Sequence, residues 1–170
     1  MGLSTIRLHK YLLDCLGDSV VVYSDLSKKP LCVQARMPDE QKLRIYLFNC
    51  SNPPGGRPLG EYKSVLNVGQ PYGSRGNFDF SGGYIVLLMG YVSEYDVFVF
   101  WDAMRHMDFG YNKNLQVQFS TILGALANEL AFQTRRTRYG QETVIAARAM
   151  HLKSAIRERI NVTIRQIVGD

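Results

Sequence analysis

The sequence predicts an α+β fold: a curled, mainly antiparallel sheet with barrel-like curvature, flanked by one N-terminal helix and two C-terminal helices. The middle of the chain consists of runs rich in β-branched and aromatic residues, separated by Gly- and Pro-rich stretches. Such runs are typical of strands joined by loops. Near both ends, apolar residues recur every three or four positions, which is typical of amphipathic helices. The order helix, several strands, helix, strand, helix indicates the α+β class.

The first helix is expected to begin after Ser4, a good N-cap residue, and to end at Gly17. Its apolar face is formed by Leu8, Leu12, Cys15 and Leu16. Two short strands follow at 19–23 and 31–37, because the second alternates apolar and polar residues. The segment between them reads as a hairpin loop.

The centre of the chain, residues 43–102, predicts two closely spaced strand pairs. The first pair is 43–48 and 61–66, and the second is 84–89 and 96–102. The loop at 49–60 holds three Pro and three Gly residues, so it is neither helix nor strand.

After a polar, irregular stretch at 102–114, the pattern predicts a long helix at about 119–139 and one more strand at 143–147. A closing amphipathic helix is expected from the spacing of its apolar residues. These are Leu152, Ile156, Ile160, Ile164 and Ile167.

Composition favours one domain over residues 1–170 and an anionic partner. The 170 residues carry a net charge of +5 and give a pI of about 9.2, which favours nucleic acid. No apolar run approaches the length of a membrane span and no secretory signal is evident, so a cytoplasmic protein is expected. Neither the three Cys nor the three His show the spacing of a zinc site. No cofactor is therefore expected, except Mg²⁺ if the chain is a nuclease.

A loop at 70–83 combines aromatic, basic and Gly residues, which indicates a recognition loop on a rigid sheet. Arg75 lies between Gly73 and Gly76, and these glycines would let the backbone approach a phosphate or a base edge. Tyr72 is expected to be exposed. Phe78 and Phe80 are assigned to the core.

A second hypothesis is a nuclease centre. Asp39 follows Pro38, and Glu61 and Lys63 form an ExK element, so the order matches PD…ExK. In such a centre the carboxylates would hold Mg²⁺ and the Lys would activate water. The competing interpretation is a strand with a solvated charged face.

A third cluster, Arg135, Arg136 and Arg138, is expected near the end of the long helix. It either binds phosphates or interacts with the helix dipole. Trp101 and Tyr84 are candidates for the walls of a base pocket, because an extruded base needs aromatic walls. A core anchor is the other interpretation of Trp101.

The middle of the chain resembles the methylase-associated domains of bacterial restriction–modification loci, and the N-terminal recognition part of some HNH restriction endonucleases. The resemblance is carried by the runs RIYLF (44–48), EYK (61–63), LLMGY (87–91), DVFVFWD (96–102) and NKNLQVQ (112–118). It implies DNA recognition in a defence system, of a defined site or of a modified base. In the HNH relatives cleavage belongs to a separate C-terminal module, and this sequence has no HNH signature.

The leading hypothesis is therefore a DNA-binding recognition domain of a restriction system. Tyr72 and Arg75 would engage the duplex, and Tyr84 and Trp101 would line a base pocket. The alternatives are a Mg²⁺-dependent endonuclease, or a protein-interaction subunit whose final helix docks a nuclease or methyltransferase; a homodimer is also open. Contacts to phosphates would come from Arg57, Lys63, Arg105 and Lys113.

Overall fold

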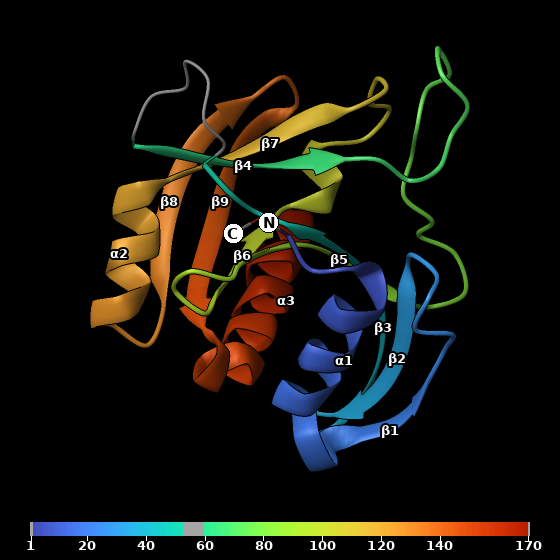
Figure 1. Cartoon of the computed structure of the whole chain (residues 1–170), viewed down its shortest axis with the longest axis vertical. Coiled ribbons are helices and arrows are strands. Elements are labelled where there is room, and N and C mark those ends of the chain that lie inside the picture. Colours follow the sequence, from blue (N-terminus) through green and yellow to red (C-terminus); the bar gives the residue numbers. More distant parts are fainter. Residues whose placement is uncertain (1, 53–59, 170) are drawn as a thin grey trace.

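The computed structural model describes residues 2–52 and 60–169. It contains three α-helices and nine strands within that part of the chain, and the predicted α+β class is confirmed (Figure 1). The helices are α1 (Thr5–Leu16), α2 (Phe119–Ala127) and α3 (Leu152–Val168), and the short 3₁₀ turns are η1 (Gly17–Ser19), η2 (Ala103–Arg105) and η3 (Ala149–His151). The strands are β1 (Val20–Tyr23), β2 (Leu31–Arg36), β3 (Glu40–Asn49), β4 (Glu61–Leu66), β5 (Ile85–Val92), β6 (Val97–Trp101), β7 (Lys113–Gln118), β8 (Ala131–Thr137) and β9 (Gly140–Arg148).

Seven strands form one open, curled sheet in the order β1-β2-β3-β5-β6-β9-β8, while β4 and β7 form a separate two-stranded ribbon. All neighbours in the large sheet are antiparallel except β3 and β5, which run parallel with Leu47 opposite Met89. The expected pairing of 43–48 with 61–66 is therefore wrong. β3 takes β5 as its partner, and β4 leaves the sheet to pair with β7.

The sheet has a hydrophobic core on each face. On one face α1 and α3 cover the sheet, with Leu12 and Ile156 among the fully buried side chains. On the other face the β4–β7 ribbon and α2 cover it, with Trp101 and Ile122 buried. Every residue of β6 is buried, because this strand lies between the two cores.

The expected helix at 119–139 is wrong over its second half. α2 ends at Ala127, and Asn128 has an extended backbone and caps the helix by donating to the Gly124 carbonyl. The chain then forms β8, which pairs with β9 through seven residues. Thr134, Thr137 and the alternation of exposure along β8 suit a strand, and pairing with β9 outweighs the helix propensity of the Arg residues.

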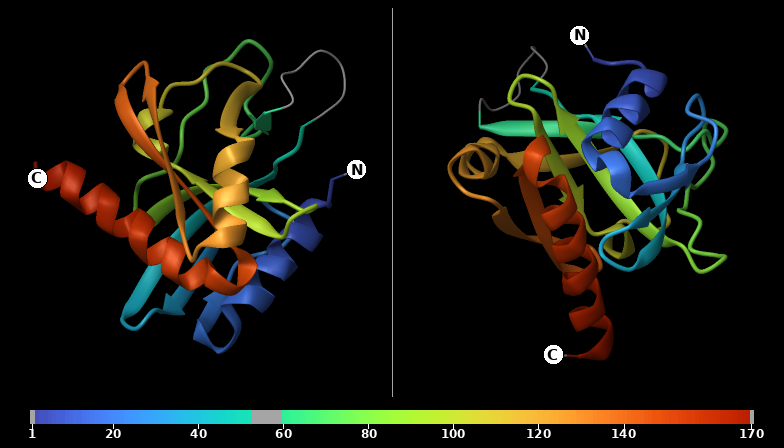
Figure 2. Two further views of the ribbon diagram at one scale, coloured as in Figure 1. Left: turned by 90° about the vertical axis from the view of Figure 1, so that its left-hand side faces the viewer. Right: turned by 90° about the horizontal axis from the view of Figure 1, so that it is seen from below.

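The closing helix is only partly packed. Leu152 and Ile156 are fully buried, whereas the exposed fractions of Ile164 and Ile167 are 52% and 66%. The C-terminal half of α3 projects from the body, on the side to which the tip of the β8–β9 hairpin also points (Figure 2, left). In the described ranges, 2–52 and 60–169, no helix is long and apolar enough to cross a membrane.

Gly90 on β5 permits the close approach of the ribbon to the sheet. A Cβ at this position would lie 2.9 Å from Cζ3 of Trp101 and 2.8 Å from Oγ of Ser64. Both neighbours are held: the Trp101 indole donates to the Gln116 carbonyl and the Ser64 hydroxyl donates to the Asn49 carbonyl.

We expect Gly90→Ala to lower the free energy of unfolding by about 1–3 kcal/mol, because overpacking here exceeds the ~0.5–1 kcal/mol gained by replacing a strand Gly. Urea unfolding followed by Trp101 fluorescence measures this. Gly60→Ala is the matched control, since a Cβ at Gly60 meets nothing within 4 Å. Equal stability of the two variants would show that Gly90 is not needed for the packing.

Candidate nucleic-acid interface

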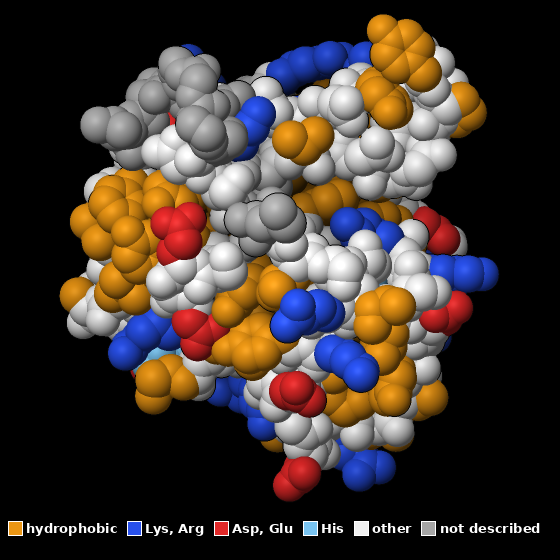
Figure 3. All heavy atoms as spheres, in the orientation of Figure 1, with side chains coloured by type: hydrophobic (Ala, Val, Ile, Leu, Met, Phe, Trp, Pro, Cys, Tyr) orange, Lys and Arg blue, Asp and Glu red, His pale blue; other side chains and the backbone are white. Residues whose placement is uncertain are grey.

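The loop between β4 and β5 presents an exposed aromatic tip. The exposed fraction of Tyr72 is 87%, as expected, and its ring meets that of Tyr111 edge-to-face with centroids 5.2 Å apart. The loop is fixed by two backbone hydrogen bonds of 2.8 and 3.0 Å between Gly76 and Phe109. Hydrophobic side chains lie over this loop at the upper right of Figure 3, and Lys or Arg side chains lie next to them along the upper edge.

Behind the tip, Phe78 packs into the core at 5% exposure, as predicted, whereas Phe80 is 43% exposed and its assignment to the core is wrong. The role expected of Gly76 is also wrong. This residue is buried, and a Cβ there would lie 2.4 Å from Cε2 of Phe109. Gly76 therefore serves packing against Phe109 rather than access to a ligand.

Arg75 is held at the side of the loop by the neighbouring segment. Its Nε lies 3.2 Å from Oδ1 of Asp108, and Nη2 donates to the Asp108 carbonyl. Asp108 is itself positioned by a 2.7 Å hydrogen bond from its backbone N–H to Asn77. About half of the Arg75 side chain stays exposed, so a charged group is presented to solvent in a fixed position.

Lys113 at the start of β7 lies within the electrostatic influence of three arginines from two other parts of the chain. Partial burial lowers the pKa of Lys113; the positive charges of Arg135, Arg138 and Arg75 lower it further, and Glu142 opposes them. Arg75 comes from the β4–β5 loop and the other two arginines from the β8–β9 hairpin. The fold therefore concentrates positive charge here.

A buried carboxylate organises this positive charge. Glu142 is 1% exposed, and its Oε1 lies 3.4 Å from Nε of Arg135. The same carboxylate accepts from Nε2 of His106 at 2.9 Å and from the backbone N–H of Asp102 at 3.1 Å. Glu142 thus ties β9, β8, the end of β6 and the turn after η2 together.

Arg105 in η2 is fixed by backbone carbonyls. Its Nε and Nη1 donate to the carbonyls of Gln141 and Tyr139, each at 3.1 Å. The Arg138 guanidinium lies 5.1 Å from the centre of the Tyr139 ring. We call the whole set the basic–aromatic surface: Tyr72, Arg75, Arg105, Tyr111, Lys113, Arg135, Arg138 and Tyr139.

Four of the predicted DNA contacts, Tyr72, Arg75, Arg105 and Lys113, lie in this surface. Lys63, Tyr84 and Trp101 lie elsewhere. Lys63 is on β4 opposite Gln116 of β7, and Arg57 lies outside the described residues.

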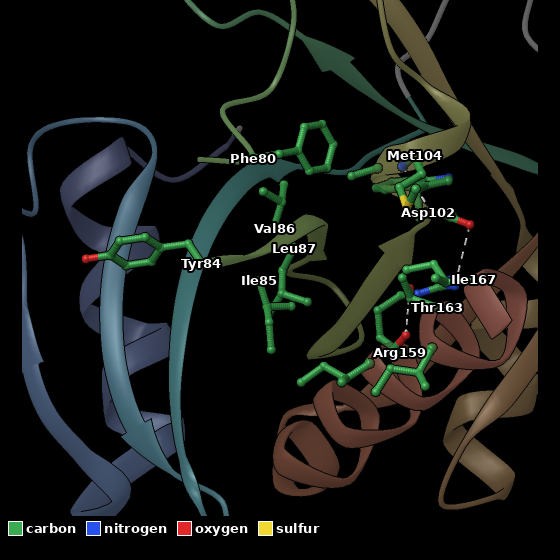
Figure 4. Close-up of a pocket in the computed structure, with 14 residues that line it drawn as sticks. Phe80, Tyr84, Ile85, Val86, Leu87, Asp102, Met104, Arg159, Thr163 and Ile167 are labelled. Carbon is green, nitrogen blue, oxygen red and sulfur yellow. Dashed lines mark hydrogen bonds and ion pairs between the residues drawn. The ribbon is translucent and has the colours of Figure 1, made fainter. Parts of the chain in front are cut away.

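The two predicted pocket walls differ from each other. Trp101 is 1% exposed and borders a cavity described below. Tyr84 also lines that cavity, although its ring extends away from it (Figure 4). Lys42 and Arg44 cover this ring at 4.4 and 4.3 Å from its centre.

The residues proposed for a nuclease centre are not brought together. Asp39 precedes β3, while Lys63 pairs with Ser51, just beyond the far end of the same strand. Ten strand residues separate the two positions by roughly 30 Å. Within the described part of the chain, no three His, Cys, Asp or Glu side chains form a group that could hold a metal ion.

Sequence reasoning missed Glu142, His106 and Tyr111, and it placed the Arg135 cluster on a helix. A signal for the correct arrangement exists in the sequence. If Arg138 and Tyr139 are read as the two-residue hairpin turn, the register places Arg135 directly opposite Glu142, which is the observed pairing.

Comparison with known proteins gives one match. The family model described as methylase-associated X1 (MTaX1) matches residues 41–156, from the start of β3 into α3. Searches of curated proteins and of solved structures find no match. The matched segment contains the whole basic–aromatic surface.

We expect Glu142→Ala to destabilise the fold by about 3–5 kcal/mol, because it leaves buried cationic and N–H partners without their acceptor. Urea unfolding measures the loss. Glu129→Ala is the control, since Glu129 is exposed between α2 and β8, and it should change stability by no more than about 0.5 kcal/mol. Similar effects of both substitutions would contradict the organising role of Glu142.

Proposed function

The chain belongs to the methylase-associated X1 family and is thereby a restriction–modification component; we propose that it recognises double-stranded DNA through the basic–aromatic surface. The observation that carries the proposal is that contacts bring basic side chains from separate segments together: Arg75 of the β4–β5 loop pairs with Asp108, and Arg135 of β8 donates to the Gln116 carbonyl on β7. Family membership supports a DNA-directed system, and the geometry supports the place of contact.

The charges of the surface suit a phosphate backbone. Arg135 is paired with buried Glu142, and Arg75 is paired with Asp108. Lys113 and Arg138 lie near these pairs. The contacts described above give neither of them an ion pair with a carboxylate, so both add positive charge to the surface. Contacts to phosphates by such groups release counterions, so they produce affinity that falls steeply with salt.

The aromatic part of the surface suits a second kind of contact. Tyr72 is exposed at the loop tip and braced by Tyr111, so its ring and hydroxyl are presented at little cost in conformational freedom. Phosphate contacts fix register and groove contacts read sequence. We assign the first role to the cationic side chains and the second to the loop tip.

The proposal includes a partner. Because the family is methylase-associated, we place the chain beside a methyltransferase or nuclease subunit that carries the chemistry. No cofactor is assigned to this chain, and the separation of Asp39 from Lys63 gives the nuclease hypothesis no geometric support.

Charge reversal tests the surface. Arg75→Glu and Arg138→Glu should each weaken duplex binding by roughly ten- to hundredfold at low salt, the loss expected for one charged contact. Each should also lower the slope of log K against log salt by about 1. Fluorescence anisotropy with a labelled duplex over a KCl series measures both quantities.

Lys10→Glu makes the same change of charge on the exposed face of α1 and serves as the control. It should leave the slope unchanged. If Arg75→Glu and Arg138→Glu bind like Lys10→Glu, the basic–aromatic surface is not the DNA contact.

A second prediction concerns pH. Because the pKa of Lys113 lies below its usual value, this side chain loses its proton earlier as pH rises, and its attraction to phosphate is lost with the proton. Duplex affinity should therefore begin to fall at a pH below the ordinary lysine pKa of about 10.4. Lys113→Arg should flatten this decline, since guanidinium stays protonated; an unchanged pH profile would remove Lys113 from the contact.

A further inference from the structure

A cavity of about 290 Å³ opens between the sheet and the projecting half of α3 (Figure 4). β5 forms one wall, the residues before it and η2 form the rim, and α3 closes the other side. The lining is mostly apolar. It includes Phe80, Val86, Trp101, Met104, Ile160 and Ile164. This size and character are those of a ligand pocket rather than of a packing defect.

Two charged side chains line the same cavity without full partners. Arg159 and Asp102 are 3% and 2% exposed, and Nη2 of Arg159 lies 3.8 Å from Oδ2 of Asp102, too far for a hydrogen bond. Nε of Arg105 is 4.0 Å from that oxygen. Nη1 of Arg159 donates to the Thr143 carbonyl, but Nε and Nη2, like Oδ2 of Asp102, have no hydrogen-bond partner in the described residues.

Buried charged groups without hydrogen-bond partners lower the stability of the fold, so their presence indicates a role other than stabilisation. The pair holds N–H donors beside a carboxylate acceptor in the wall of the cavity, and these atoms are shielded from solvent. Its complement is a planar group with an acceptor next to an N–H donor. Cytosine and adenine have such an edge, a ring nitrogen beside an exocyclic amine, and their flat faces and any methyl substituent suit apolar walls.

We propose that this cavity receives a cytosine or adenine base extruded from DNA, with the methylated forms included, and that Arg159 and Asp102 hydrogen-bond its edge. The inference rests on the proposed DNA binding. The geometry links the two sites, because Met104 lines the cavity while its neighbour Arg105 belongs to the basic–aromatic surface. The hairpin tip and the C-terminal half of α3 project to the same side of the molecule (Figure 2, left).

The test compares duplexes that differ at one central position. The base there is cytosine, 5-methylcytosine, adenine or N6-methyladenine, either correctly paired or opposite a mismatched base. Extrusion of a mismatched base requires less unpairing. The full chain should therefore bind at least one mismatched duplex about tenfold or more tightly than its paired counterpart.

Ile164→Trp places a large ring at the rim of the cavity and should abolish this preference while keeping the affinity for paired DNA. Val168→Trp is the matched control, because Val168 is exposed on the same helix and does not line the cavity; it should keep the preference. Asp102→Asn, which exchanges the acceptor for an amide, should reduce discrimination between the bases.

Equal affinity for all duplexes, or a preference that survives Ile164→Trp, would overturn the base pocket. In that case, strong salt-dependent binding would leave the proposed DNA surface standing, and the apolar groove would be assigned to a segment of a partner subunit. If the chain binds none of the duplexes, both proposals are wrong, because both require that it binds DNA.

Discussion

The whole structure depends on the burial of β6 on both faces. Its five residues alternate between the two cores: Phe98 and Phe100 face the helices, while Val97, Val99 and Trp101 face the ribbon. A strand buried in this way needs a cover on each side. α1 and α3 supply one cover and the β4–β7 ribbon with α2 supplies the other. The chain leaves β6 at Asp102, so the strand that anchors the fold also delivers the residues where the surface and the cavity meet.

Buried charges determine the arrangement of the region after Asp102, where the basic–aromatic surface meets the cavity. Glu142 is placed inside the protein, where a carboxylate is costly unless it is fully paired. Its pairing with Arg135, His106 and the Asp102 backbone meets this requirement and at the same time fixes η2 and the hairpin. Asp102 and Arg159, at the neighbouring cavity, are buried to a similar degree but incompletely paired. Glu142 thus belongs to a charge network that stabilises the fold, whereas Asp102 and Arg159 keep hydrogen-bonding groups that the protein does not use.

The pattern of apolar and turn residues predicted the elements that depend on neighbouring residues in the sequence. Ser4, Gly17 and the spacing of Leu8, Leu12 and Leu16 defined α1, and the β5–β6 hairpin followed from its apolar runs. The parallel pairing of β3 with β5 was not predictable in this way, because β4 and its two flanking loops lie between these strands in the sequence. The helix expected at 119–139 failed because Leu130 and Phe132 fit a helical stripe, while the deciding interaction is the pairing of β8 with β9.

The same distinction explains the site. The exposure of Tyr72 and Arg75 was predictable because they lie in a loop of unusual composition, whereas Glu142 is marked only by its register across the β8–β9 hairpin, which the helix expected at 119–139 concealed. The family match ends at residue 156, within the first half of α3. Residues 41–156 include the basic–aromatic surface, but Arg159, Ile160 and Ile164 on α3 follow it. The proposed contact with the DNA backbone therefore belongs to the part shared with the family. One wall of the cavity is built by residues beyond it, and these include Arg159, the one cationic residue among the described residues that line the cavity. If the surface binds DNA in general and the cavity selects the base, the selective element of this chain lies in α3.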